Sequence, residues 1–238
     1  MRHIFTLFIL TNFILTGYCQ DFKFIKPTLT DSTKVVKTEI DTKNQFERIY
    51  FIDYSKKSQE KNELANFGFD SKKPNQNIGF TYLGVLKNLK TRPIKINSNL
   101  PEKWVKLFKY KGDWVLSNDL PKYILTDSCL ISFDMDDPSA SAISDYKFVN
   151  DKYLLSLLSY NWENPIINLK SNFEIKVLDS KRMITLWKCN FRDQESYELR
   201  IPVNQISNFP IMVMLETDSM GDENDIFDKI DYEKLWKK

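Results

Sequence analysis

Acidic residues in two neighbouring stretches are the side chains of this sequence best suited to chemistry. Asp134 and Asp136 lie in an acidic run that ends at Pro138, and Glu163 follows Trp162 in a polar segment. Two carboxyl groups at a suitable separation can hydrolyse a glycosidic bond without histidine. The sequence does not set that separation, so a secreted carboxylate-based glycoside hydrolase is an alternative hypothesis and not the leading one.

The same acidic run begins like a calcium-binding loop. Asp134, Asp136 and Asp145 fall at the first, third and twelfth positions of such a loop. However, Pro138 occupies the fifth position, which supplies a ligand in such a loop, Ser139 occupies the sixth, where the sharp turn needs glycine, and the last ligand is not glutamate. An acidic surface turn is the favoured interpretation, and no metal or cofactor is predicted. A cation-stabilised structural module is a second alternative.

Trp162 is the aromatic residue with the clearest candidate role in binding. Its neighbours Asn161, Glu163, Asn164 and Pro165 are typical of a loop, and loops carry many binding residues. Trp162 and Glu163, together with Asp134 and Asp136 of the acidic run, form the set of candidate binding residues. The competing interpretation is that most aromatic side chains in a β-rich protein belong to its core.

Residues 1–19 predict a secretory signal peptide. Arg2 precedes an apolar run from Ile4 to Leu15, and small residues lie just before Gln20. The apolar run is too short for a comfortable membrane span. Tyr18 disfavours lipidation of the cysteine that follows it. We therefore expect a secreted or periplasmic protein in which residues 20–238 form a single β-rich domain, with membrane contact only through this segment if it is uncleaved or lipidated.

Removal of this segment would leave residues 20–238 without histidine, because His3 is the only histidine of the chain. Ser-His-Asp catalysis, Cys-His catalysis and histidine-ligated zinc are then excluded, and no catalytic residue is predicted. The remaining cysteines are Cys129 and Cys189, both on apolar strand faces. An oxidising compartment would favour a disulfide between them. Two separate buried thiols are the other interpretation.

Alternating apolar residues indicate the elements that must position these side chains. Phe173, Ile175 and Val177 alternate with charged residues, Asp179-Ser180-Lys181 predicts a turn, and the alternation resumes through Phe191, as in a β-hairpin. A hairpin needs further strands against its apolar face. Similar patterns predict strands near residues 35–40, 46–54, 78–86, 105–110, 114–117, 123–133, 153–160, 197–203 and 211–215.

These patterns predict an all-β, mostly antiparallel fold: a sandwich or open barrel of about ten strands. A short amphipathic C-terminal helix is expected from about Asp225. A short helix is also expected within Ser58–Phe67, and a turn at Thr126–Ser128 should lift Asp127 out of the apolar face of its strand. Lys111-Gly112-Asp113 predicts a hairpin turn.

Composition and charge limit the choice of partner. The chain has 238 residues, 42% of them hydrophobic, and a net charge of +2. Basic residues alternate with aromatic ones over Lys87–Lys111, which we interpret as a solvated strand face with its aromatic side chains turned inward, and no nucleic-acid partner is predicted. The leading hypothesis is an exported, non-enzymatic protein that binds a protein or glycan partner at the cell envelope or outside the cell.

Overall fold

The structure is a computed structural model that describes residues 30–41, 46–67, 94–96, 99–117, 121–133, 139–159, 169–192, 194–216 and 226–237. The strands are β1 (Thr33–Asp41), β2 (Phe46–Asp53), β3 (Lys103–Tyr110), β4 (Asp113–Ser117), β5 (Lys122–Leu125), β6 (Cys129–Phe133), β7 (Ser139–Val149), β8 (Lys152–Ser159), β9 (Leu169–Asp179), β10 (Ile184–Phe191), β11 (Gln194–Pro202) and β12 (Ile211–Glu216). The helices are α2 (Gln59–Ala65), the 3-10 helix η1 (Val203–Asn208) and α4 (Tyr232–Lys237).

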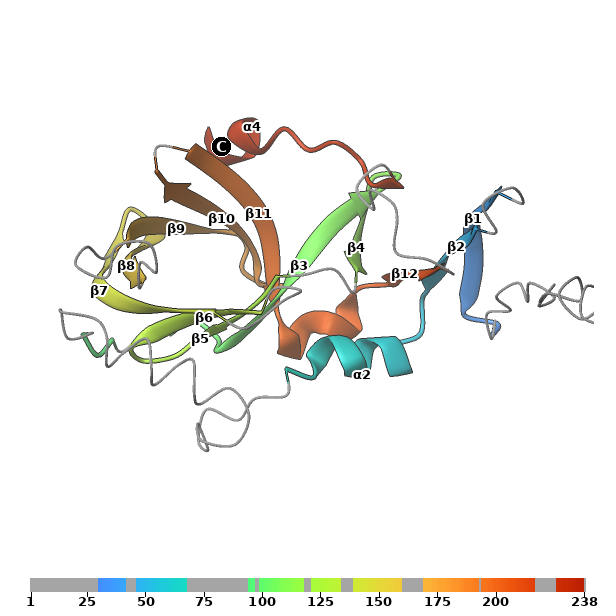
Figure 1. Ribbon diagram of the computed structural model, residues 1–238, viewed down its shortest axis with the longest axis horizontal. Coiled ribbons are helices and arrows are strands. Elements are labelled where there is room, and N and C mark those ends of the chain that lie inside the picture. Colours follow the sequence, from blue (N-terminus) through green and yellow to red (C-terminus); the bar gives the residue numbers. More distant parts are fainter. Residues whose placement is uncertain are drawn as a thin grey trace, which may run out of the picture.

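Eight of these strands form a closed antiparallel barrel (Figure 1). Strands β5 to β11 each pair with the next in sequence, and β3 pairs with both ends of this series. Leu107 of β3 lies opposite Leu199 of β11, and Trp104 lies opposite Tyr123 of β5. The predicted all-β, mostly antiparallel fold with a short C-terminal helix is confirmed. The barrel is closed, which removes the exposed edges that an open barrel would keep.

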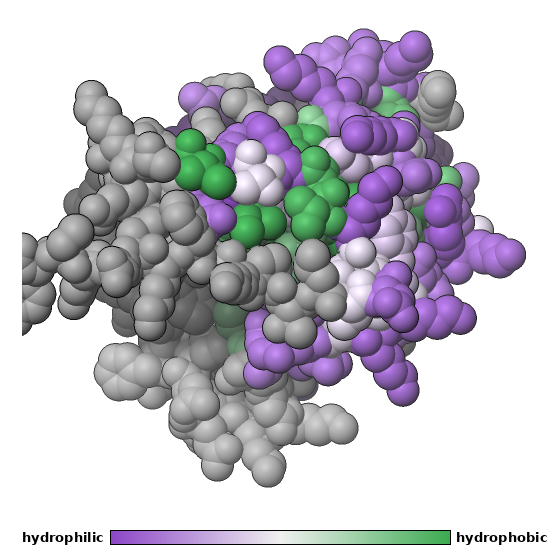
Figure 2. All heavy atoms as spheres, turned by 90° about the vertical axis from the view of Figure 1, so that its right-hand side faces the viewer, coloured by the Kyte–Doolittle hydropathy of each residue, from purple (hydrophilic) through white to green (hydrophobic). Residues whose placement is uncertain are grey.

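Strand β3 is also the first strand of a second sheet, which lies outside the barrel. It continues through β4, β12 and β2 to β1, and the β4–β12 pair is the one parallel pair among the described strands. Figure 1 shows this sheet extending away from the barrel, with α2 and η1 side by side below β12. Figure 2 shows hydrophobic side chains near the centre of the face seen from the β1 side of the molecule. Val35 and Ile40 of β1 are 41% and 55% exposed.

Aromatic and aliphatic side chains fill the barrel lumen. Trp104 and Trp187 are 0% and 2% exposed, and their ring centroids are 5.3 Å apart. Tyr123 on β5 and Phe173 on β9 project from opposite walls, yet their ring centroids lie 6.2 Å apart at 88°. Ring contacts among the described residues therefore cross the full width of the barrel at this level.

A second apolar core lies outside the barrel wall. Leu199 and Ile201 of β11 and Leu107 of β3 point outward and pack with Leu64 and Phe67 beside α2. Further members of this outer core are Phe51, Leu116, Ile124, Ile131, Leu186, Phe209, Ile211 and Val213. Strand β12 is buried on both faces, because Ile211 and Val213 belong to this outer core and Met212 joins a separate cluster on the other side. The barrel wall near the second sheet is therefore buried inside and outside.

The short-range predictions that fall on described residues agree with the structure apart from one helix boundary, and the strand predicted near residues 78–86 lies outside the described residues. Ser58 caps the N-terminus of α2, where its hydroxyl accepts a hydrogen bond from the Lys61 amide. A turn at Thr126–Ser128 separates β5 from β6, and Asp127 is exposed. Helix α4 begins at Tyr232, later than predicted, because Asp228 is held against the β3–β4 turn by accepting hydrogen bonds from the amides of residues 111 and 112 at 3.0 and 2.8 Å.

The disulfide expected between Cys129 and Cys189 is not formed, and both are free thiols. Cys129 lies on β6 and Cys189 on β10, and three barrel strands separate β6 from β10 in either direction around the wall. The two residues therefore occupy opposite sides of the barrel. A disulfide needs Cα atoms within about 7 Å of each other, which these positions do not allow without rearranging the wall.

Thiol labelling tests this correction. Without any reductant, denatured protein should take up one alkyl group at each of Cys129 and Cys189. In the native protein we expect Cys189 to react more slowly than an unperturbed cysteine at about pH 8, because burial and the nearby Glu198 carboxylate raise the pKa of its thiol. Its rate should rise as the pH approaches that raised pKa. Mass spectrometry showing a linked, unlabelled pair would contradict the structure.

Hydrogen bonds to the Asp53 carboxylate connect the end of β2 with the residues just before β1 and just after β2. Its carboxylate accepts hydrogen bonds from the Ser55 amide and hydroxyl, both at 2.8 Å, and from the Ser32 hydroxyl at 3.3 Å. Burial acts to raise the pKa of Asp53, but the hydrogen bonds from Ser55 and Ser58 and the nearby Lys61 ammonium together outweigh it, and the pKa lies below its ordinary value. The charged form is therefore favoured by folding.

We expect Asp53→Asn to lower the free energy of unfolding by about 1–3 kcal/mol at about pH 7. The contribution of the carboxylate is complete above its unfolded-state pKa and is lost as the pH falls through the lower folded-state pKa. The gap between the wild type and the variant should therefore close in acid. Urea unfolding at about pH 7 and about pH 2 measures this. A gap of equal size at both pH values would show that Asp53 acts through packing alone.

Candidate functional site

The candidate binding residues from the sequence are Asp134, Asp136, Trp162 and Glu163, and all four lie outside the described residues. Asp145, the twelfth position of the calcium-like spacing, is described. Its carboxylate pairs with the Lys147 ammonium at 2.8 Å and accepts the Tyr146 amide at 2.9 Å. In the part of the chain that the structure describes, no group of three or more His, Cys, Asp or Glu residues could hold a metal ion.

A charged cluster lies inside the barrel. Arg200 is 0% exposed, and its Cζ lies 3.6 Å from the centroid of the Tyr123 ring. Its Nε donates to the Glu198 carboxylate at 3.0 Å, and its Nη1 donates to the Pro121 carbonyl at 2.9 Å. The Lys106 ammonium lies 3.7 Å from the other oxygen of Glu198. A buried arginine of this kind is a candidate for holding an anion.

Hydrogen bonds within the protein nevertheless complete this cluster. Thr185 donates to the Arg200 carbonyl at 2.9 Å and accepts from the Trp187 indole at 2.9 Å. Among the described residues, every buried side-chain nitrogen and oxygen has a partner. The arginine already has a carboxylate, a carbonyl and an aromatic face, so we interpret the cluster as the polar part of the barrel core and not as a ligand site.

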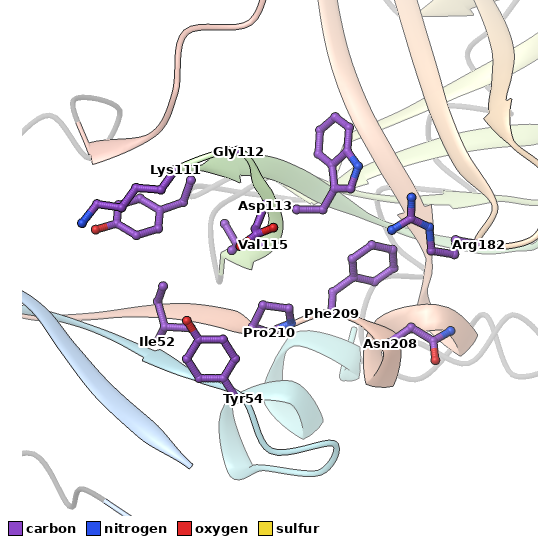
Figure 3. A pocket seen from close by; sticks show the side chains of 12 residues that line it. Ile52, Tyr54, Lys111, Gly112, Asp113, Val115, Arg182, Asn208, Phe209 and Pro210 are labelled. Carbon is purple, nitrogen blue, oxygen red and sulfur yellow. The ribbon is translucent and has the colours of Figure 1, made fainter. Parts of the chain in front are cut away.

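One open site among the described residues lies outside the barrel, where the second sheet leaves it. A pocket of about 370 Å³ lies between the start of β4, the start of β12 and the β9–β10 turn (Figure 3). It is lined by Ile52, Tyr54, Tyr110, Lys111, Gly112, Asp113, Trp114, Val115, Arg182, Asn208, Phe209 and Pro210. In Figure 3, Lys111 lies at one end and Arg182 at the other, with Phe209 and Pro210 between them.

A second pocket of about 410 Å³ adjoins the first. It is lined by Trp114, Lys176, Val177, Leu178, Asp179, Arg182, Ile184 and Leu235. Trp114 and Arg182 line both pockets. The two pockets share these two side chains and are together called the β4 groove here; their lining extends from Tyr54 past Trp114 to Leu235 on α4.

Arg182 is held in place from within its own turn. Asp179 accepts hydrogen bonds from the Arg182 amide at 3.0 Å and from its Nε at 2.8 Å, and these bonds lower the pKa of Asp179. The guanidinium Cζ lies 5.8 Å from the centroid of the Phe209 ring. Among the described residues, the two terminal nitrogens of Arg182 have no hydrogen-bond partner. The turn thus presents two donor groups on a fixed cation to the groove.

Turn geometry shapes the two ends of the groove. Lys111 and Gly112 both have positive φ, at 50° and 89°, the arrangement of a type I′ hairpin turn. Met183 follows Arg182 with φ at 52° and leads into a register shift at the start of β10. Sequence reasoning predicted both turns but did not join them into one site. Only pairings between distant strands bring the β3–β4 and β9–β10 turns together.

The fold and site define a closed eight-stranded antiparallel barrel with a second sheet and an aromatic, partly charged groove at their junction. A scan against protein-family models, a search of curated proteins and a search of solved structures each gave no match for this chain. No helix among the described residues is both long and apolar enough to cross a membrane.

Proposed function

We propose that this protein is an exported, non-enzymatic binding protein that receives a protein or glycan partner in the β4 groove, at the cell envelope or outside the cell. The observation that carries the proposal is that side chains fill the barrel lumen, whereas the β4 groove is open. An eight-stranded barrel can hold one small ligand inside when side chains do not fill its interior. Here Tyr123, Phe173 and Trp187 occupy the lumen, whereas the groove is open and combines aromatic side chains with a fixed guanidinium.

Export is the part of the proposal that rests on residues 1–19, with their basic start, apolar run and small residues before Gln20. The groove supports binding by its composition. Tyr54 at its rim is 57% exposed, and an exposed aromatic ring with polar neighbours suits contact with either a sugar or a polypeptide. A volume of about 370 Å³ falls at the lower end of the range for ligand pockets.

Site-specific photo-crosslinking in the native cells tests this function. A photoreactive phenylalanine analogue replaces Tyr54 at the groove rim, or Phe148 on β7 outside the groove. The two positions are matched, since they are 57% and 56% exposed. We expect a covalent adduct from position 54 and none of that mass from position 148. Proteolysis and glycan staining of the adduct then identify the partner as protein or carbohydrate.

Two results would overturn the proposal. The absence of an adduct from position 54, or the same adducts from both positions, would remove the β4 groove as the binding site. Release of sugars from a polysaccharide panel by the purified protein would replace binding with the hydrolase alternative.

A further inference from the structure

Residues 226–237, here called the strap, connect the second sheet with the barrel from outside. Figure 1 shows this segment running from the β3–β4 turn across to α4 on the outer wall of the barrel. Strand β11 pairs with β3 only as far as Leu107, and the Asp228 amide donates to the Lys109 carbonyl, two residues further along β3, at 2.8 Å. The strap therefore continues along the edge of β3 where β11 ends.

Asp228 anchors the strap on the β3–β4 turn. One oxygen of its carboxylate accepts the Lys111 amide at 3.0 Å, and the other accepts the Gly112 amide at 2.8 Å. Beside this contact, the Phe227 ring stacks on the Phe108 ring, with centroids 4.3 Å apart and 19° between the ring planes. Lys111 and Gly112 also line the β4 groove. The strap thus occupies two backbone donors on a wall of the groove.

Helix α4 anchors the other end of the strap on the barrel wall. The Trp236 carbonyl accepts a hydrogen bond from the Lys176 ammonium of β9 at 3.0 Å. The Tyr232 ring lies parallel to the Tyr197 ring of β11, with centroids 6.3 Å apart. Lys176 and Leu235 both line the β4 groove. This second anchor therefore also belongs to a wall of the groove.

The strap is docked on the protein without being buried in it. None of residues 226–237 is buried, so even the side chains that touch the outer core keep part of their surface in solvent. Helix α4 has six residues, and an isolated helix of that length is not stable in water. Ordering the strap costs conformational entropy that so little burial barely offsets, and such segments open locally, below the free energy of global unfolding. We therefore expect the strap to leave while the barrel and the second sheet stay folded.

We propose that the strap regulates the β4 groove: it restricts the groove while docked, and its release admits the partner. The proposal rests on the binding function proposed above and adds the regulation of that site. Release removes Leu235 from one wall of the groove. It also frees three hydrogen-bond donors on the walls, the amides of Lys111 and Gly112 and the ammonium of Lys176. A partner that supplies acceptors to these donors binds the released state more tightly and shifts the population toward it.

Hydrogen exchange of the Asp228 amide tests whether the strap opens by itself. This amide bonds across the contact between the strap and β3, whereas the Ile143 amide bonds to the Ser128 carbonyl within the barrel. In the wild type we expect a lower protection factor for Asp228 than for Ile143. Asp228→Asn should lower the protection factor at position 228 about tenfold, because an asparagine side chain offers one oxygen to the two turn amides. The protection factor of Ile143 should not change.

Asp231→Asn is the matched control. It removes the same charge from the strap, but the Asp231 carboxylate accepts the Lys234 amide within the strap, at 2.9 Å. Asparagine caps a helix about as well as aspartate. The protection factor of the Asp228 amide should therefore stay at its wild-type value in this variant.

A crosslinking titration tests the regulation. Purified protein with the photoreactive residue at position 54 is titrated into the envelope fraction, and the concentration that gives half of the maximal adduct is measured. Apparent affinity is proportional to the fraction of protein in the binding-competent state. Asp228→Asn should therefore lower this concentration about tenfold, in step with its effect on exchange. Asp231→Asn should leave it unchanged.

Equal protection of the Asp228 and Ile143 amides in the wild type would overturn local release of the strap, and so would an equal fall at both amides in Asp228→Asn. Faster exchange at position 228 with an unchanged half-maximal concentration would overturn the regulation and leave the binding function intact. The absence of an adduct from position 54 in every variant would overturn the binding function, and the regulation with it, even where exchange shows that the strap opens.

Discussion

Replacing Arg200 with alanine lowers the free energy of unfolding by about 3–5 kcal/mol, the range for removing one partner of a buried ion pair. The arginine is 0% exposed, and its guanidinium contacts the Glu198 carboxylate, the Pro121 carbonyl and the Tyr123 ring at once. Alanine would leave a cavity in the lumen. The Glu198 carboxylate and the Pro121 carbonyl would also lose the N–H groups of Arg200 that donate to them. Urea unfolding followed by tryptophan fluorescence measures the change.

Arg182→Ala is the control for this experiment, because Arg182 has a side chain 45% exposed and an ion pair with Asp179 within a turn. Its effect should stay within about 0.5 kcal/mol. The double variant Arg200→Met with Glu198→Gln should recover much of the stability lost in Arg200→Ala, since an apolar side chain of similar volume then fills the site without a buried charge. An Arg200→Ala variant as stable as Arg182→Ala would show that the cluster does not support the barrel core.

Trp187→Ala should cost a similar amount, about 3–5 kcal/mol. The Trp187 side chain is 2% exposed and lies among three other rings of the lumen, with centroids 5.3 Å from Trp104, 5.5 Å from Tyr123 and 6.1 Å from Phe173. These rings come from four different strands. Loss of the Trp187 ring removes packing between opposite walls, which the neighbouring side chains can only partly recover. Thermal and urea unfolding both report this change.

Trp187→Phe separates packing from hydrogen bonding. Phenylalanine retains a ring in the lumen but gives up the indole bond to Thr185 at 2.9 Å. We expect it to cost about 1–2 kcal/mol, well below the cost of alanine. If both substitutions had the same effect, the hydrogen bond to Thr185, and not the ring contacts, would be the larger contribution of Trp187.

The sequence predicted the local structure of the barrel well. The alternation in Phe173, Ile175 and Val177 gave the β9–β10 hairpin, and Ser58 and Gly112 marked a helix start and a hairpin turn. Closure of the barrel could not be predicted. It depends on Trp104 pairing with Tyr123 and on Leu107 pairing with Leu199, and no periodicity specifies which distant strands meet.

Strand β11 shows why the site was harder to predict. Leu199 and Ile201 alternate with Glu198 and Arg200, which suggests an apolar inner face and a solvated outer one. In the structure the apolar residues face the outer core and Arg200 points into the lumen, so both faces are buried. Likewise, Trp114 and Arg182 are 68 positions apart in the sequence, and each has an ordinary local role in a strand or turn. They belong to one site only because the fold brings both side chains into the lining of the same two pockets.

Strand β3 belongs to the barrel and to the second sheet at the same time, and this couples the opening of the two units. It pairs with β5 and β4 along one edge and with β11 along the other. Successive amides of β3 face opposite edges, so the whole strand is released only when neighbours from both units separate, and we expect its slowest amides to report the global unfolding equilibrium. Strand β1, at the far edge, pairs with β2 alone among the described strands and can fray by itself. The cooperativity of unfolding thus declines from the shared strand β3 toward β1. The β4 groove includes Tyr110 of β3 in its lining and so lies near the more cooperative end of this sheet.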